Sequence, residues 1–175
     1  MYQINIYKNN KENTARYLLG SKGASNLVVF GINPSTADEN KPDPTIKKVI
    51  RHANKNGFDG WIMCNIYPLR ATDFDDLTKD LDEKLHKENV TTIVKFLCAE
   101  KNIKILAAWG NLITERKYLM LCLKDLVASI KTLQPEWFVI SKNVTGHPKH
   151  PLYSKEKMFE PFDIDSYLNQ FVDKQ

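Results

Sequence analysis

Four short apolar runs, separated by longer stretches with helical periodicity, are the feature that most restricts what this chain can fold into. The runs are Leu27–Phe30, Trp61–Ile66, Ile103–Trp109 and Trp137–Ile140. Leu27–Phe30 and Trp137–Ile140 are apolar throughout, and the other two runs are interrupted only by Asn65 and Lys104. Short runs of this kind are typical of strands that are covered on both faces. The intervening segments 44–56, 81–100 and 114–132 carry apolar residues at helical spacing. This alternation predicts an α/β fold with three layers, α/β/α, around a central, mainly parallel four-stranded sheet.

The segments on either side of this core are predicted to form a hairpin and a closing helix. Residues 2–7 and 16–19 read as two strands around a polar turn, and residues 165–172 read as a helix. No linker or repeat divides the chain. We therefore predict a single domain over residues 1–175, with the hairpin in 1–25, the core in 26–155 and a C-terminal tail and helix in 156–175.

Composition excludes several classes of protein. Of the 175 residues, 42% are hydrophobic and 26% are charged, as in globular domains that are neither disordered nor fibrous. The net charge of +4 is compatible with a polyanionic partner but too small to require one. No apolar run is long enough to cross a membrane, and the first residues lack the apolar core of a secretory signal. Cys64, Cys98 and Cys122 have no metal-ligand spacing, which predicts buried thiols in a cytoplasmic protein.

The ends of the predicted strands deserve the closest inspection, because ligands of open parallel sheets bind beyond the carboxyl ends of the strands. The first end is the segment 31–38, in which Gly31 permits close backbone approach and Pro34 stiffens the turn. Ser35 and Thr36 offer hydroxyls and amides suited to an anion. An ordinary strand-to-helix loop has the same residue types, and spacing alone favours that interpretation.

The second end carries Asn65 and, shortly after it, Arg70. An asparagine that closes an apolar strand must find hydrogen bonds, and its amide can read the edge of a nucleobase. The planar fork of Arg70 can bind phosphate or carboxylate. A structural interpretation is equally open: Asn65 would cap the strand, and Arg70 would pair with Asp73 or Asp75.

The third and fourth ends differ in polarity. Trp109 and Asn111 flank a glycine at the third end, where the tryptophan is more typical of a core than of a ligand site. The fourth end holds His147, Lys149 and His150 between prolines, and is the densest polar cluster of the chain.

Zinc is the obvious alternative for the two loop histidines, because they are three residues apart. No carboxylate or thiol shares their loop, and the other histidines, His52 and His86, fall on predicted helices. The pattern therefore argues against a metal site, and we expect neither a metal nor another cofactor. A rigid histidine loop that places a hydrogen-bond donor beside a ligand fits better.

The ordered set of these motifs resembles the bacterial family of domains of unknown function numbered sixteen-forty-three. The resemblance rests on Asn-Pro-Ser-Thr-Ala-Asp at 33–38, Asp-Pro-Thr at 43–45, Asn65 with Arg-Ala-Thr at 70–72, Trp-Gly-Asn at 109–111 and His-Pro-Leu-Tyr at 150–153, and it covers residues 16–155. This family name implies no activity.

The same order of motifs is more distantly similar to the uracil-DNA glycosylase superfamily. Gly-Ile-Asn-Pro at 31–34, the strand ending in Asn65, the Trp-Gly pair at 109–110 and the loop 147–152 resemble its motifs. This likeness implies hydrolysis of an N-glycosidic bond, Asn65 as the residue that fixes the base, and a DNA-contacting wedge around Lys149, Leu152 and Tyr153. The chain departs from the superfamily in having Ser35 where the mismatch-specific branch has glycine, in lacking a nearby stacking aromatic after Asn33, and in lacking the iron–sulfur cysteines.

Such a reaction needs a hydrogen-bond donor for the departing base and a positioned water. His147 or His150 can supply the donor, and Asn33 can orient the water but cannot accept its proton. Asp38 is then the better carboxylate candidate, because Asp43 precedes Pro44 and reads as a helix N-cap.

We therefore predict a glycosylase-like protein whose partner is a nucleic acid or a nucleobase-containing small molecule. Two alternatives stay open. One is a non-catalytic nucleotide- or nucleic-acid-binding module, favoured by the missing aromatic and by asparagine at the water position. The other is a small-molecule hydrolase or transferase that uses the histidine loop as an anion site.

Overall fold

The computed structural model describes residues 2–172 of the chain. Its strands are β1 (Ile6–Asn9), β2 (Arg16–Ser21), β3 (Asn26–Gly31), β4 (Gly60–Asn65), β5 (Lys104–Ala107), β6 (Glu136–Val139) and β7 (Glu160–Pro161). Its α-helices are α1 (Pro44–Lys55), α2 (Glu83–Leu97), α3 (Lys117–Ile130) and α4 (Ile164–Val172). The α/β class, the predicted apolar strands and the helices between them are confirmed.

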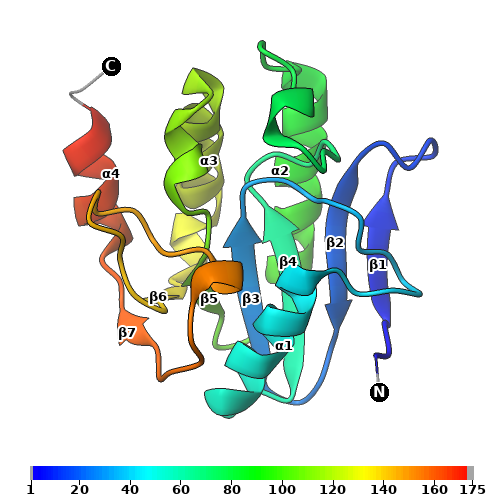
Figure 1. Ribbon diagram of the computed structural model, residues 1–175, viewed down its shortest axis with the longest axis vertical. Coiled ribbons are helices and arrows are strands. Elements are labelled where there is room, and N and C mark those ends of the chain that lie inside the picture. Colours follow the sequence, from blue (N-terminus) through cyan, green and yellow to red (C-terminus); the bar gives the residue numbers. More distant parts are fainter. Residues whose placement is uncertain (1, 173–175) are drawn as a thin grey trace.

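All seven strands form one sheet in the order β1-β2-β4-β3-β5-β6-β7. The four central strands, β4, β3, β5 and β6, are parallel, whereas β1, β2 and β7 join the edges in antiparallel pairs (Figure 1). The predicted four-stranded sheet is therefore wrong in its strand count. The reason is that β2 pairs with β4, with Leu19 opposite Met63, so the N-terminal hairpin extends one edge of the sheet, and that β7 pairs with β6 at the other edge.

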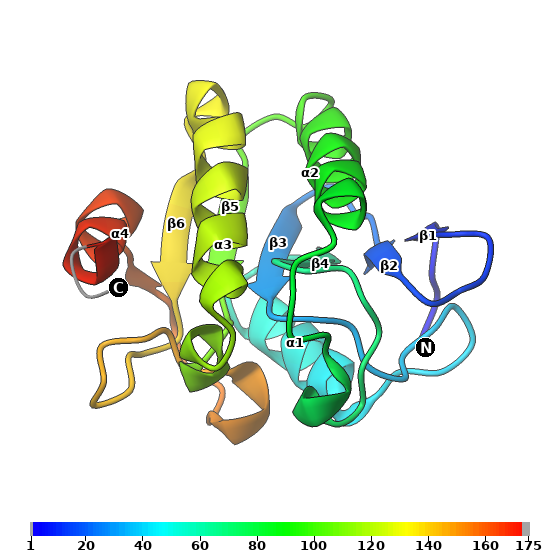
Figure 2. The same cartoon turned by 90° about the horizontal axis from the view of Figure 1, so that it is seen from above.

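The two faces of the sheet bury different helices, because successive strand residues point to opposite sides. Val28 and Phe30 belong to the core beneath α2 and α3, and Leu27 and Val29 belong to the core beneath α1. Figure 2 shows α2 and α3 on one side of the strands and α1 on the other, with α4 beyond the β6 edge. The parallel strands are thus covered on both faces, as their apolar sequences predict.

Helix α1 begins where its sequence says it should. The side chain of Asp43 accepts a hydrogen bond of 2.8 Å from the backbone N–H of Ile46, and Pro44 occupies the first helical position. This is the N-cap arrangement that the sequence predicts. It fixes the N-terminus of α1 at the same end of the sheet as the carboxyl ends of the parallel strands.

Two further predictions have definite outcomes. Cys64 and Cys122 are buried, as expected, but the prediction is wrong for Cys98, which is exposed at the C-terminal end of α2. That position is the C-cap of the helix and directly follows Leu97, its last buried residue.

Among residues 2–172, no helix combines the length and apolar character needed to cross a membrane.

Candidate functional site

Three adjoining hollows lie along the carboxyl ends of the parallel strands. The central cavity has a volume of about 360 Å³, and among its lining residues are Arg16, Gly31, Asn33, Ser35, Thr36, Asp43, Met63, Phe74, Trp109, Leu112, His150 and Leu152. A hollow on the hairpin side, of about 400 Å³, includes Ser35, Thr36, Asp38 and Arg70. A hollow on the opposite side, of about 410 Å³, includes Trp109, Asn111, Lys149, His150 and Tyr153. Shared residues join each hollow to the central cavity, so segments far apart in sequence meet at one rim.

Asn33 has a fixed orientation in the central cavity. Its Nδ2 donates to the carbonyl oxygens of Pro34 and Ala71, at 3.1 and 2.9 Å. Both amide protons are thereby used, and Oδ1 receives no hydrogen bond from residues 2–172. Because the buried loop carbonyls require a donor here, the amide cannot flip, and Asn33 presents an acceptor to whatever occupies the cavity.

The two loop histidines have different environments, and only His150 lines the central cavity. Its Nδ1 accepts a hydrogen bond of 3.3 Å from the backbone N–H of Leu152, so the proton of the neutral ring lies on Nε2. Burial lowers the pKa of His150 to about 4, partly offset by the charge of Asp43. His150 is therefore a neutral hydrogen-bond donor near neutral pH.

His147 lies behind the cavity and belongs to the protein interior. Its ring stacks on Phe171 with 4.5 Å between centroids, and its Nδ1 lies 2.8 Å from the hydroxyl of Tyr167. That hydroxyl also accepts a hydrogen bond of 3.0 Å from Nε1 of Trp109. This chain of hydrogen bonds anchors α4 to the strand ends, and burial lowers the pKa of His147.

The two aspartate candidates also separate. Asp38 accepts hydrogen bonds of 2.8 Å from the backbone N–H groups of Asn40 and Lys41, which lower its pKa, and it lies in the hairpin-side hollow. Among the described residues that line the central cavity, Asp43 is the one carboxylate. Only its Oδ1 serves the N-cap bond to Ile46. The structure thus places Asp43, and not Asp38, beside Asn33 and His150.

Asn65 lies directly under the floor of the central cavity. It is fully buried, and neither Nδ2 nor Oδ1 has a hydrogen-bond partner among residues 2–172. A Cβ at Gly31 would stand 2.5 Å from Cε of Met63 and 3.1 Å from Oδ1 of Asn65, so the glycine makes room for both side chains. Asn65 does not line the cavity itself, because Met63 and Gly31 form the surface there.

Arg70 holds the loop that carries Asn33. Its Nη1 donates to the carbonyl oxygens of Ser35 and Ala37, at 2.6 and 3.2 Å, and its Nη2 donates to the hydroxyl of Tyr7 at 2.8 Å. The predicted pairing of Arg70 with Asp73 or Asp75 is wrong, because the guanidinium turns to the loop carbonyls. Pro34, in the same loop, is buried and lines none of the three hollows.

The remaining predicted residues have mixed roles. Trp109 is 1% exposed and packs in the core, as its sequence context predicts, while one edge reaches the cavity. Oδ1 of Asn111 accepts hydrogen bonds of 2.8 Å from Asn143 and Thr145, which ties two loops together. Lys149 and Tyr153 line the hollow on the side away from the hairpin, and Tyr153 is 74% exposed.

Arg16 and Phe74 are lining residues that the sequence does not single out. Arg16 lies on β2 and is 2% exposed, and Phe74 follows the second strand end. A charged residue inside the apolar stretch 15–19 is a signal for Arg16, and an aromatic in a strand-end loop is a signal for Phe74. Phe74 supplies an aromatic face that the loop after Asn33 lacks, and the guanidinium carbon of Arg116 lies 4.9 Å from its ring centroid.

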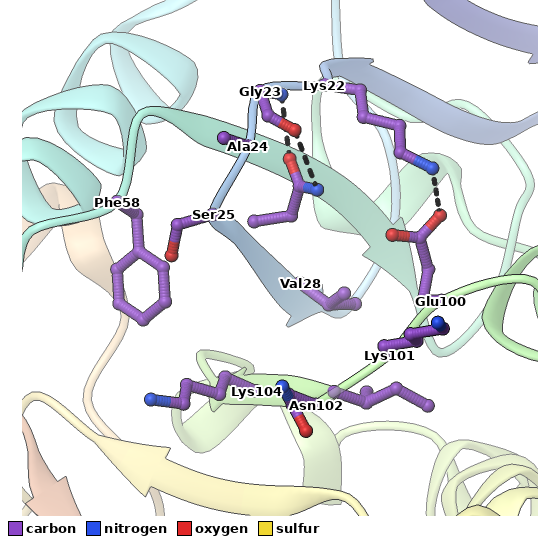
Figure 3. A pocket seen from close by; sticks show the side chains of 12 residues that line it. Lys22, Gly23, Ala24, Ser25, Val28, Phe58, Glu100, Lys101, Asn102 and Lys104 are labelled. Atoms are coloured by element: carbon purple, nitrogen blue, oxygen red, sulfur yellow. Dashed lines mark hydrogen bonds and ion pairs between the residues drawn. The ribbon is translucent and has the colours of Figure 1, made fainter.

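A separate cavity of about 360 Å³ lies at the opposite end of the sheet, where β3 and β5 begin. Figure 3 shows its lysines and the ion pair between Lys22 and Glu100. Lys104 lies with Nζ 6.0 Å from the ring centroid of Phe58. None of the predicted site residues lines this cavity. Within residues 2–172, no group of three or more histidine, cysteine or acidic side chains is arranged to hold a metal ion.

Comparison with known families places the chain. The model of the family described as "Protein of unknown function (DUF1643)" matches residues 16–152. The chain belongs to this family. The match confirms the family resemblance and runs from Arg16 to Leu152, so it encloses all the residues named above for the central cavity of this DUF1643 protein. No curated protein and no solved structure matches, and the likeness to uracil-DNA glycosylases stays a prediction.

Acid is expected to destabilise this protein well before its carboxylates are titrated. Burial lowers the pKa values of His52, His147 and His150. Below the ordinary histidine pKa, these rings are therefore protonated in the unfolded chain but neutral in the folded chain. This stability is present above about pH 6.5, the unfolded value, and is lost as the pH falls through the folded values. With a folded pKa of about 4, His150 alone accounts for a loss of about 2 kcal/mol between about pH 7 and about pH 5.

Urea unfolding at these two pH values measures the loss. The His150→Gln variant should lose less stability over this interval than the parent chain. Equal losses in the two proteins would show that His150 titrates normally in the folded state.

Proposed function

We propose that the central cavity binds a nucleobase-containing ligand and that the protein hydrolyses its N-glycosidic bond. The observation that carries the proposal is the meeting of Asn33, Asp43 and His150 at one small cavity. Its volume of about 360 Å³ falls at the lower end of the usual range for ligand sites and suits a base with its sugar. Phe74 and Leu112 supply apolar contact surface.

The donor and acceptor pattern suits this chemistry. In the proposed reaction the oxygen of a water attacks the anomeric carbon, and the bond from that carbon to the base nitrogen breaks. The electron pair leaves with the base, and Nε2–H of His150 donates to a base oxygen where negative charge develops. Oδ1 of Asn33 accepts a hydrogen bond from the water, and the carboxylate of Asp43 takes its proton.

Asn65 supports the choice of a nucleobase. A buried amide without partners costs about 1–3 kcal/mol, and its donor and acceptor match the adjoining carbonyl and ring N–H of uracil or hypoxanthine. Only the side chain of Met63, which is flexible, and Gly31 separate it from the cavity. A displacement of Met63 would open Asn65 to the ligand.

A non-catalytic binding module is the second candidate. The observation that favours it is that both polar groups near the water position have structural tasks: Asn33 secures two loop carbonyls, and Asp43 caps α1. A site of this kind would bind a base without turning it over. Salt-dependent binding of DNA, or binding of nucleosides, without release of base would select this function.

The test is to incubate the protein with oligonucleotides containing uracil, hypoxanthine or mismatches, with free nucleosides and with nucleoside monophosphates, and to measure released base. We expect release from at least one substrate. Asn33→Ala should lower the rate about tenfold to a hundredfold, because the water loses its orienting acceptor. The matched control is Asn54→Ala, at an exposed position of α1. No release from any substrate, or equal rates in both variants, would overturn hydrolysis at this site.

A further inference from the structure

Arg16 is a buried cation without a counter-ion in the part of the chain that the structure describes. Only 2% of the residue is exposed, and it lines the central cavity. Within residues 2–172 it forms no ion pair, and its one side-chain hydrogen bond runs from Nη1 to the carbonyl oxygen of Ala37, at 2.8 Å. Buried charges in proteins are normally paired, because desolvation of an unpaired ion is costly.

The unused part of the guanidinium is the part that binds oxyanions. Nε is buried without a partner, and Nη2 forms no hydrogen bond within the described residues. These two nitrogens form one edge of the planar group and donate two parallel hydrogen bonds, which match two oxygens of a phosphate or carboxylate. The remaining nitrogen, Nη1, is the one that holds Ala37.

A second positive charge, that of Arg70, lies close to Arg16. Arg70 donates to the same carbonyl oxygen of Ala37, at 3.2 Å, so two guanidinium groups lie against one loop. Burial lowers the pKa of Arg16 to about 10, and the charge of Arg70 lowers it further. Asp43 acts in the opposite direction, but it forms no ion pair with Arg16. An anion in the cavity would relieve this repulsion.

Neutral donors complete the surroundings. Ser35, Thr36 and Thr45 line the cavity, and their hydroxyls have no partner among the described residues. The N–H of Thr45, at the second position of α1, is one of the free N–H groups of a helix N-terminus. A tetrahedral group with three terminal oxygens can use the edge of Arg16 and these donors together, whereas a carboxylate has one oxygen fewer.

We propose that Arg16 binds a phosphate monoester, and that the ligand of the central cavity is a nucleoside monophosphate. The inference rests on the proposed function for its nucleobase part and on Arg16 for its phosphate part. A small nucleotide fits better than a DNA chain, because so deeply buried a guanidinium reaches a terminal phosphate more readily than an internal phosphodiester.

The experiment compares four probes on the full chain by calorimetry: uridine, uridine 5′-monophosphate, ribose 5-phosphate, and a short uracil oligonucleotide without terminal phosphates. We expect the monophosphate to bind at least about tenfold more tightly than uridine. Arg16→Lys should remove most of that difference and leave uridine affinity within about twofold, since lysine lacks the two-nitrogen edge. Arg51→Lys, at an exposed position of α1, is the matched control.

A measurement on the unaltered protein keeps the test decisive if Arg16→Lys does not fold. The Nε–H resonance of Arg16 should shift when the monophosphate or ribose 5-phosphate is added, and should not shift with uridine. Equal affinities for uridine and its monophosphate would overturn this inference and leave nucleobase binding intact. Ribose 5-phosphate binding as tightly as the monophosphate would overturn the nucleobase proposal and leave the phosphate site. Binding of the oligonucleotide more tightly than uridine 5′-monophosphate would overturn the assignment to a phosphate monoester.

Discussion

Replacement of Asp43 by asparagine is expected to remove hydrolysis and to leave helix α1 intact. Asparagine is as good an N-cap as aspartate, so its Oδ1 can still accept from the N–H of Ile46. It cannot take a proton from the attacking water. We therefore expect the rate of base release to fall by about 10²–10⁴-fold at unchanged stability. Asp43→Ala should lose the same activity and, in addition, about 1 kcal/mol of stability from the missing cap.

The matched control for this pair of variants is Asp163→Asn. Asp163 caps the first turn of α4 in the same way, accepting from the N–H of Ser166 at 2.8 Å, and lies outside the three hollows. Its replacement should leave the rate unchanged. A full rate in Asp43→Asn would contradict the assignment, and a loss confined to Asp38→Asn would return the role of base to the carboxylate that the sequence favours.

Replacement of His150 by alanine is the second large effect that we expect. The neutral ring donates from Nε2 to the departing base, and loss of one such donor lowers turnover by about 10²–10³-fold. His150→Gln should recover part of the rate, because its side-chain amide also donates. Comparison of base release in the two variants measures this, with His86→Gln, on α2, as the control.

The pH dependence of the same rate tests the protonation state. Because the pKa of His150 is lowered to about 4, the ring stays neutral down to about pH 5, and its charge does not change near neutral pH. The rate should therefore show no acid limb near about pH 6.5, the ordinary histidine value. An acid or alkaline limb at that pH, absent from His150→Gln, would show that the ring titrates normally and would contradict a neutral donor.

The fold was largely accessible from the sequence, because its central strands are buried on both faces and its helices carry clear end signals. Asp43 and Pro44 predict the start of α1, and the structure has it there. The hairpin is the exception. Its pairing with β4 depends on a strand that carries both a buried arginine and apolar residues on each face, and neither local propensity nor periodicity reports which sheet such a strand joins.

The location of the candidate site was also accessible, but the choice between similar residues was not. His147 and His150 both lie beside prolines in one loop. Contacts with the distant residues Tyr167 and Phe171 hold the ring of His147 in the protein interior, and His150 is the histidine that lines the cavity. Asp38 lies in the hairpin-side hollow and Asp43 in the central cavity, because the loop between β3 and α1 is held in place by Arg70. Arg16 lies before the first motif of the series, so a search restricted to strand ends passes over it.

The proposed reaction requires a ligand that occupies the central cavity. A crystal structure of the protein soaked with uridine 5′-monophosphate tests this directly. We predict the base between Asn33 and His150, the sugar beside Asp43, and the phosphate on the Nε–Nη2 edge of Arg16. Nucleotide bound between the lysines at the opposite end of the sheet, with the central cavity empty at saturating ligand, would contradict it.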